Sequence, residues 1–183
     1  MKRTALTFFA LTAVLGSVAN TSQAQSLVTV AAGATIPTGD YGKYANTGWT
    51  ATAGVLFPVG RPGLMAGGHA LFGSNSHSDL DGDKTNLLGV LGTVAYRFGD
   101  PTRPGVFVLG NVGMLRHSYS SDNFPDDEGS ESGVAFGGAA GFSIPRDNMI
   151  LHVSAGLLTA SIEGSSTSFI PLQLGISIPF GQR

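Results

Sequence analysis

Residues 169–180 read Phe-Ile-Pro-Leu-Gln-Leu-Gly-Ile-Ser-Ile-Pro-Phe, and this segment decides the fold. Every second residue from Ile170 to Phe180 is large and apolar, whereas the residues between them are small, polar or proline. Because alternate side chains of a strand point to opposite faces, the segment predicts a strand with one apolar face. Its length matches a membrane-spanning β-strand and is roughly twice that of a typical strand in a soluble protein. We therefore expect the closing strand of a transmembrane β-barrel.

The amino-terminal residues 1–24 have the pattern of a cleavable secretory signal peptide. Lys2 and Arg3 give a positive start, residues 5–19 are mostly apolar, and Ser22-Gln23-Ala24 supplies small residues at a cleavage site. The apolar part is too short for a transmembrane helix. The sequence thus predicts an exported protein whose mature chain, residues 25–183, is a single domain.

The composition narrows the class of protein. Charged residues make up 12% of the chain, about half the share of an average soluble domain, and the formal net charge is only −2. This mild charge does not favour a nucleic-acid binder. The chain has no cysteine, which excludes disulfides, thiolate catalysis and thiolate metal ligands. A low surface charge suits a barrel whose outer wall faces lipid.

Seven further segments alternate apolar residues with small or polar ones. These predicted strands cover residues 27–36, 48–59, 64–73, 85–98, 106–118, 133–144 and 149–158. The alternation in residues 106–118 is irregular, so its phase stays open. Short turns at Gly60, Pro101 and Pro145 alternate with longer loops, including polar loops at residues 159–168 and 119–132. This pattern predicts an all-β, eight-stranded, antiparallel up-and-down barrel, with loops centred on Tyr41, Asp81, Asp126 and Gly164 outside the cell.

The whole mature chain resembles the small eight-stranded outer-membrane β-barrels of the OmpA/OmpX type. The local matches are Gly-Ala-Thr-Ile-Pro-Thr-Gly-Asp at residues 33–40 and Phe-Ile-Pro-Leu-Gln-Leu-Gly-Ile at residues 169–176. The resemblance implies the outer membrane of a Gram-negative-type cell as the location. It implies outer-membrane lipid and lipopolysaccharide as partners, and it assigns no activity.

Three histidines are the main candidates for chemistry. Strand parity predicts that His69 and His152 point into the lumen, and His117 too if residues 106–118 have the expected phase. Their different depths along the strands argue against a shared metal site. A lipid A-modifying enzyme would need a serine beside His117 at the loop end. The side chain of Ser118 is expected on the opposite face of the strand from His117. Ser120 is expected on the same face as His117, but at the point where the loop begins.

Acidic residues gather in two predicted loops. Asp79, Asp81 and Asp83 lack the spacing of a helix-loop-helix calcium site, so we interpret them as a solvated turn with at most weak calcium or magnesium binding. The same applies to the acidic loop of residues 119–132. Arg97 is expected inside the barrel, with no carboxylate near it except Asp100 or Asp147 at the turn rim.

The predicted lumen is filled rather than open. Its expected inward side chains include Leu56, Met65, His69, Leu87, Leu91, Arg97, His152 and Gln173. Eight strands enclose an interior that side chains just fill, and no ring of charges marks an ion pathway. The sequence thus favours a non-enzymatic structural or surface-interaction protein with no catalytic residue, cofactor or metal. The alternatives are a lipid A-modifying enzyme, a narrow pore or apolar-ligand conduit, and, for the fold, a soluble lipocalin-like barrel.

Overall fold

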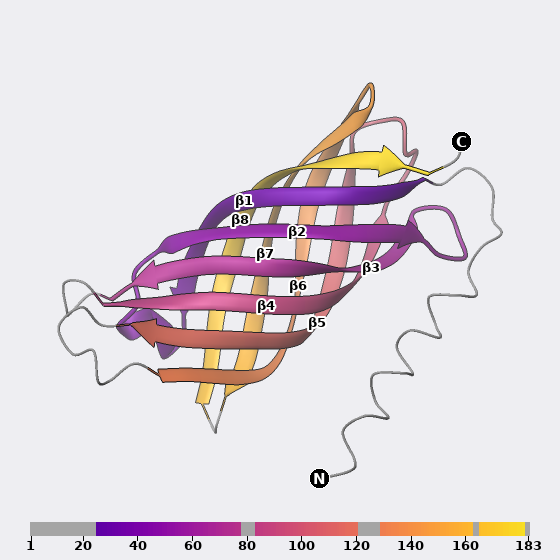
Figure 1. The fold of residues 1–183 in the computed structure, drawn as a ribbon. Helices are drawn as coiled ribbons and strands as arrows, with labels where there is room; N and C mark the ends of the chain where they lie inside the picture. Colours follow the sequence, from indigo (N-terminus) through magenta and orange to yellow (C-terminus); the bar gives the residue numbers. More distant parts are fainter. Residues whose placement is uncertain (1–24, 78–82, 121–128, 163–164, 182–183) are drawn as a thin grey trace, which may run out of the picture.

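The computed structural model describes residues 25–77, 83–120, 129–162 and 165–181 (Figure 1). The predicted signal peptide, Asp79, Asp81 and the loop residues 121–128 lie outside the described residues. The eight strands are β1 (Ser26–Thr38), β2 (Gly48–Pro58), β3 (Leu64–Ser76), β4 (Lys84–Arg97), β5 (Gly105–Ser120), β6 (Gly129–Arg146), β7 (Met149–Ile162) and β8 (Ser165–Phe180). A short 3-10 helix, η1 (Tyr41–Lys43), follows β1.

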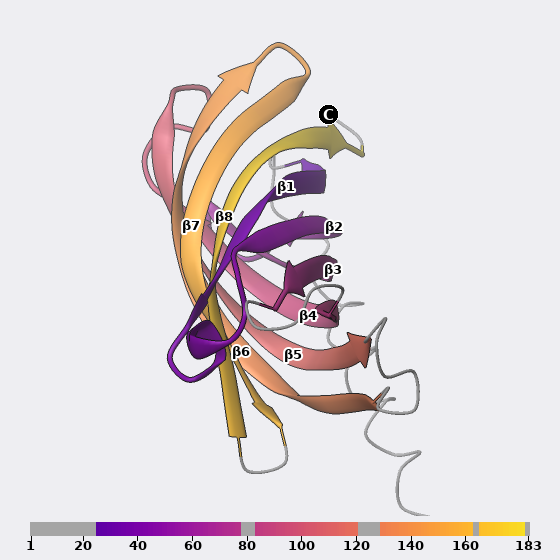
Figure 2. The same cartoon turned by 90° about the vertical axis from the view of Figure 1, so that its left-hand side faces the viewer.

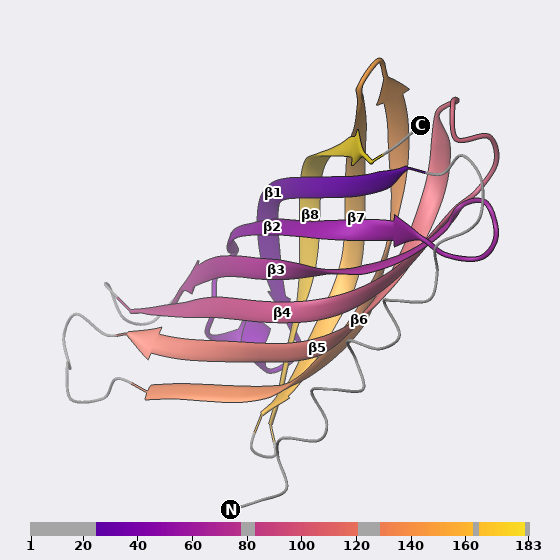
Figure 3. The ribbon, with the colours of Figure 1, turned by 45° about the vertical axis from the view of Figure 1, so that its right-hand side comes forward.

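The strands form one closed antiparallel barrel in chain order. Each strand pairs with the next, and β8 closes the barrel against β1 from Ser26 opposite Phe180 to Thr38 opposite Ser168. The strands curve around a common interior, as Figures 2 and 3 show from two further sides. The eight-stranded antiparallel fold is confirmed. None of the described residues belongs to a helix long and apolar enough to cross a membrane.

The apolar row of every strand lies on the outside of the barrel. Val90 of β4 and Leu174 of β8 expose 69% and 70% of their surface, whereas inward Leu91 exposes 1%. On β5, Val106, Val112 and other even-numbered residues point outward, which settles the phase that the sequence left open. In a soluble lipocalin-like barrel the apolar rows would point into the interior, which is the opposite of what the structure shows. An apolar outer wall is what a barrel presents to lipid.

Charge is almost absent from this outer wall. Among the described strand residues, the outward rows carry only three charged side chains, Lys84, Arg116 and Arg146, and all three lie towards strand ends. Aromatic rings cluster instead at the turn end, where Phe57 packs edge-on against Phe180 at 6.3 Å between ring centroids. Rings at the ends of an apolar wall are typical of membrane barrels.

The predicted bounds of one connection are wrong, and its predicted centre, Gly164, lies outside the described residues. The polar residues 159–168 were expected to form a loop, but β7 continues to Ile162 and β8 begins at Ser165. Thr159 pairs with Ser168, and their hydroxyl oxygens lie 3.0 Å apart. The ladder continues because cross-strand pairs of small hydroxyl residues stabilise a sheet as well as apolar pairs do. Residues 129–132 likewise extend β6 beyond its predicted start.

Close packing inside the barrel requires a glycine at position 175. A Cβ there would clash with Nε2 of His152 and would lie 2.6 Å from the carbonyl oxygen of Val30. Overpacking of this kind costs typically about 1–3 kcal/mol. We expect Gly175→Ala to lower the free energy of unfolding in lipid vesicles by that amount. Gly110→Ala is the matched control, since a Cβ at Gly110 would meet nothing within 4 Å; an equal loss in both variants would contradict the packing argument.

Candidate functional site

The interior contains a cluster of buried apolar side chains, called here the apolar layer. Its members are Leu71, Leu87, Leu91, Leu115, Ala135, Leu158, Ala160 and Phe169, each at most 3% exposed. All lie in the inward rows and most lie in the half of their strand nearer the loops. Six of the eight strands contribute, so inward apolar residues far apart in sequence meet at one level. The layer lies between a polar loop end and a cavity at the turn end, and β1 and β2 contribute none of its side chains.

The loop end is filled by aromatic and polar groups. Tyr41 of η1 is buried, and burial raises the pKa of its hydroxyl to about 12. Its ring lies 6.3 Å from the ring of His117, measured between centroids. Nε2 of His77 lies 2.8 Å from the hydroxyl oxygen of Thr85, and the His77 ring lies 5.4 Å from that of Tyr119. These contacts tie the chain after β1 to the ends of β3, β4 and β5.

The prediction of a solvated acidic turn is wrong for Asp83, which is buried. Its side chain is 1% exposed and accepts a hydrogen bond from the hydroxyl of Tyr119, while its carbonyl accepts one from the backbone N–H of His77 at 3.0 Å. The carboxylate is therefore part of the buried loop end. Sequence alone missed this contact because Asp83 and Tyr119 come from different parts of the chain.

A second buried network anchors the first loop. Asn75 is 0% exposed. Its side-chain oxygen accepts a hydrogen bond from the Thr35 hydroxyl at 2.9 Å, and its Nδ2 donates to the Asn46 carbonyl at 2.8 Å. Asn75 thus joins β1, β3 and the segment after η1. Together with the Tyr41 contacts, this network holds the first loop over the lumen.

The predicted histidines do not converge. His69 and His152 point inward as predicted, and so does His117, but each lies in its own setting. The described residues contain no group of three His, Asp or Glu side chains placed to hold a metal ion. Ser120 was expected to share the face of His117, and this was wrong. The inward row of β5 contains Leu115, His117 and Tyr119. Ser118 and Ser120 therefore belong to the opposite, outward row.

The turn-end cavity has a volume of about 180 Å³. The predicted inward residues Leu56, Met65, His69, Leu91, Arg97, His152 and Gln173 all line it, and Leu87 lies in the apolar layer. The layer forms the inner end of the cavity through Leu71, Leu91 and Leu158. At the other end the cavity reaches Gly63 and Arg97 at the turn rim.

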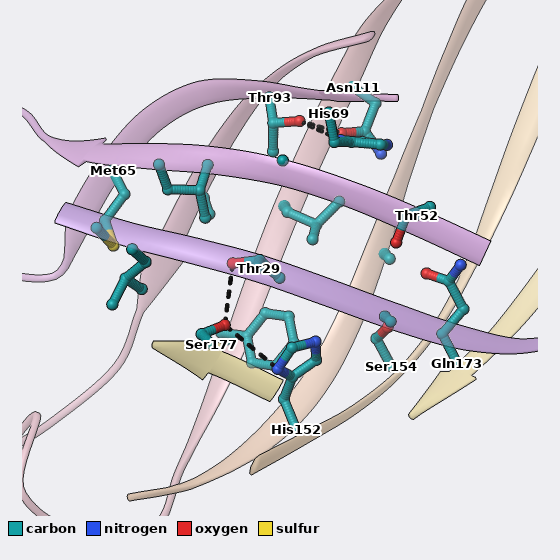
Figure 4. A pocket seen from close by; sticks show the side chains of 18 of the residues that line it. Thr29, Thr52, Met65, His69, Thr93, Asn111, His152, Ser154, Gln173 and Ser177 are labelled. Atoms are coloured by element: carbon teal, nitrogen blue, oxygen red, sulfur yellow. Dashed lines mark hydrogen bonds between the residues drawn. The ribbon is translucent and has the colours of Figure 1, made fainter. Parts of the chain in front are cut away.

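Two hydrogen-bonded groups face each other across this cavity (Figure 4). On β4 and its neighbours, the Thr93 hydroxyl donates to Oδ1 of Asn111 at 2.9 Å and lies 2.8 Å from Nδ1 of His69. On the opposite wall, the Ser177 hydroxyl lies 3.0 Å from that of Thr29 and 3.5 Å from Nδ1 of His152. The strand order places β3, β4 and β5 opposite β7, β8 and β1. These histidines therefore pair with hydroxyl groups, as buried polar side chains generally do.

Arg97 is held at the turn rim by neutral acceptors. Its Nε donates to the Ser143 hydroxyl at 2.9 Å, its Nη1 to the Asp100 carbonyl at 2.7 Å, and its Nη2 to the Arg103 carbonyl. The sequence suggested the carboxylate of Asp100 or Asp147 as a partner for Arg97 at the rim. Asp100 does contact Arg97, but through its backbone carbonyl rather than its carboxylate. The Asp100 carboxylate instead accepts hydrogen bonds from the Thr102 hydroxyl and backbone, which lower its pKa.

Comparison with known proteins supports the fold. The chain is similar to the crystal structure of Neisserial surface protein A, with 12% sequence identity and a TM-score of 0.64 over 85% of this chain and 96% of that one. It is also similar to a major outer membrane protein of Thermus thermophilus, with 13% identity and a TM-score of 0.51 over 85% of this chain and 98% of that one. No family model and no curated protein sequence matches. The chain thus has the fold of the small eight-stranded outer-membrane β-barrels, as its sequence predicts.

Proposed function

We propose that the protein is a non-enzymatic outer-membrane β-barrel with a structural or surface-interaction role and a lumen closed to ions. Residues 1–24 direct export, and residues 25–183 form the mature barrel. The observation that carries the proposal is the apolar layer, whose eight side chains are at most 3% exposed. A continuous ion pathway needs water and polar or charged groups along its length, and this layer supplies neither.

The outer wall supports lipid and lipopolysaccharide as the partners. Its outward rows are apolar, and among the described strand residues the two charged side chains towards the loop ends of these rows, Lys84 and Arg116, are both basic and exposed. They lie on the neighbouring strands β4 and β5. Basic side chains at this height suit the phosphate groups of the outer leaflet, because ammonium and guanidinium groups form strong charge-assisted hydrogen bonds with phosphate.

A non-enzymatic role is favoured by the position of His117. The neighbouring serines of β5 alternate with the inward row, so neither Ser118 nor Ser120 shares a face with the imidazole. A nucleophile and its base must lie within hydrogen-bond reach. Release of acyl chains from lipid A by the purified barrel, lost in His117→Ala, would overturn this part of the proposal.

Location and orientation can be tested by cysteine labelling, because the chain has no cysteine of its own. Thr47 lies in the first loop and Asn148 in the last turn, and both are exposed. We expect a membrane-impermeant maleimide to label Thr47→Cys in intact cells, and to label Asn148→Cys only after the outer membrane is permeabilised. Labelling of Asn148→Cys alone in intact cells would reverse the orientation. Recovery of the protein outside the outer-membrane fraction would reject the proposed location.

A further inference from the structure

The turn-end cavity has the features of a small-molecule site that a purely structural barrel does not need. Its volume of about 180 Å³ exceeds that of engineered protein cavities that hold benzene, which are about 150 Å³. Its apolar lining includes Leu27, Leu56, Met65, Phe107 and Leu109. Ligand sites in proteins are typically apolar concavities with a few fixed polar groups, and barrel mouths are a common place for them.

Six polar side chains of the side walls form two hydrogen-bonded groups, whereas Gln173 also lines the cavity with a buried Nε2 that has no hydrogen-bond partner among the described residues. His69, Thr93 and Asn111 form one hydrogen-bonded group, and Thr29, Ser177 and His152 form the other. These six side chains already use part of their hydrogen-bonding capacity on one another. The walls between the two groups are lined by apolar side chains, and they favour an apolar ligand. A ligand that carries polar groups along its whole length would leave many of them without partners at the leucine and phenylalanine side chains.

Arg97 supplies one fixed positive charge at the entrance. Among the described residues it forms no salt bridge with a carboxylate, since the two ion pairs present involve Lys43 and Arg103. Its guanidinium has five N–H donors, and its hydrogen bonds go to three neutral acceptors. The nearby Asp100 carboxylate is engaged by Thr102 and Arg103 rather than by Arg97. The remaining N–H donors of Arg97 suit an anionic group, and a carboxylate matches the planar guanidinium best.

We propose that this cavity binds a small amphiphilic carboxylate, such as a medium-chain fatty acid. The carboxylate lies on Arg97 at the turn rim, and the hydrocarbon chain extends past Met65 and Phe107 towards the apolar layer. Along β4, Arg97 lies six positions after Leu91 of that layer, a path of roughly 20 Å at about 3.3 Å per residue. Because the layer closes the inner end, the cavity holds its ligand and does not conduct it across the barrel.

The proposal can be tested with octanoate and the full mature barrel in phosphatidylcholine nanodiscs. The readout is the NMR signals of the histidine rings, because His69 and His152 line the cavity while His77 lies beyond the apolar layer. We expect octanoate to shift the His69 and His152 signals in a saturable way and to leave His77 unchanged. Octan-1-ol, with the same chain length and no charge, should bind at least about tenfold more weakly, as loss of a charged hydrogen bond predicts.

A pair of variants separates the entrance charge from charge in general. Arg97→Met should weaken octanoate binding about tenfold or more. Arg146→Met removes a charge from the same end of the barrel, but Arg146 does not line the cavity, so binding should be unchanged. The comparison of octanoate with octan-1-ol uses the unaltered protein and holds even if Arg97→Met does not fold. Equal binding of the two probes, equal effects of the two variants, or shifts that also include His77 would overturn the proposal.

Discussion

Replacing Ala53 with arginine should lower the stability of the barrel in lipid by about 2–4 kcal/mol. Ala53 lies mid-strand in the outward row of β2, opposite Val30 and Ala70 of the neighbouring strands, and its side chain is exposed. A guanidinium at this depth would face lipid with no water and no carboxylate nearby. Urea unfolding in lipid vesicles, followed by fluorescence of the single tryptophan Trp49, would measure the loss.

The control for this prediction is the neighbouring position. Thr52 points inward and lines the turn-end cavity. Thr52→Arg should therefore cost less than Ala53→Arg, because a charge in the lumen keeps contact with polar groups and water. Equal losses from the two variants would mean that the facing of β2 is assigned wrongly, or that the outer wall does not meet lipid.

Replacing Phe169 with alanine should cost about 3–5 kcal/mol, the usual range for removing a fully buried phenylalanine. Phe169 is 0% exposed and is the largest side chain of the apolar layer. Its removal leaves a void that the curved, closed wall cannot fill by collapse. Urea unfolding in vesicles gives the stability, and current across a planar lipid bilayer tests the layer as a barrier. The unaltered protein should show no sustained conductance.

Phe136→Ala is the matched control, since Phe136 points outward and is 56% exposed. Lipid chains fill the space that it leaves, so only the transfer free energy of the ring is lost, about 1.5–3 kcal/mol. A larger cost for Phe136→Ala than for Phe169→Ala would contradict the packing assigned to the apolar layer. Stable single-channel steps from the unaltered protein would favour a pore instead of the proposed closed barrel.

Local sequence patterns predict much of the architecture. The alternation from Ile170 to Phe180 predicts both the last strand and its lipid-facing row, and the same pattern predicts the other seven strands. This works because the outer wall of a membrane barrel selects apolar side chains at every second position. Prediction failed where polar residues continue a strand, as at Thr159 and Ser168, since their pattern does not differ from that of a loop.

The sequence by itself determined the strand count, the antiparallel order and most inward residues, including Arg97, His69 and His152, whereas the inward position of His117 followed only from the phase of β5 in the structure. Only the tertiary structure decided which inward residues meet: Thr93 with Asn111 and His69, Asp83 with Tyr119, and Arg97 with Ser143. Whether a side chain points inward or outward depends on the two-residue alternation along its own strand, which is a local property of the sequence. Depth inside the barrel depends on the stagger between strands, which is fixed by closure of all eight strands together.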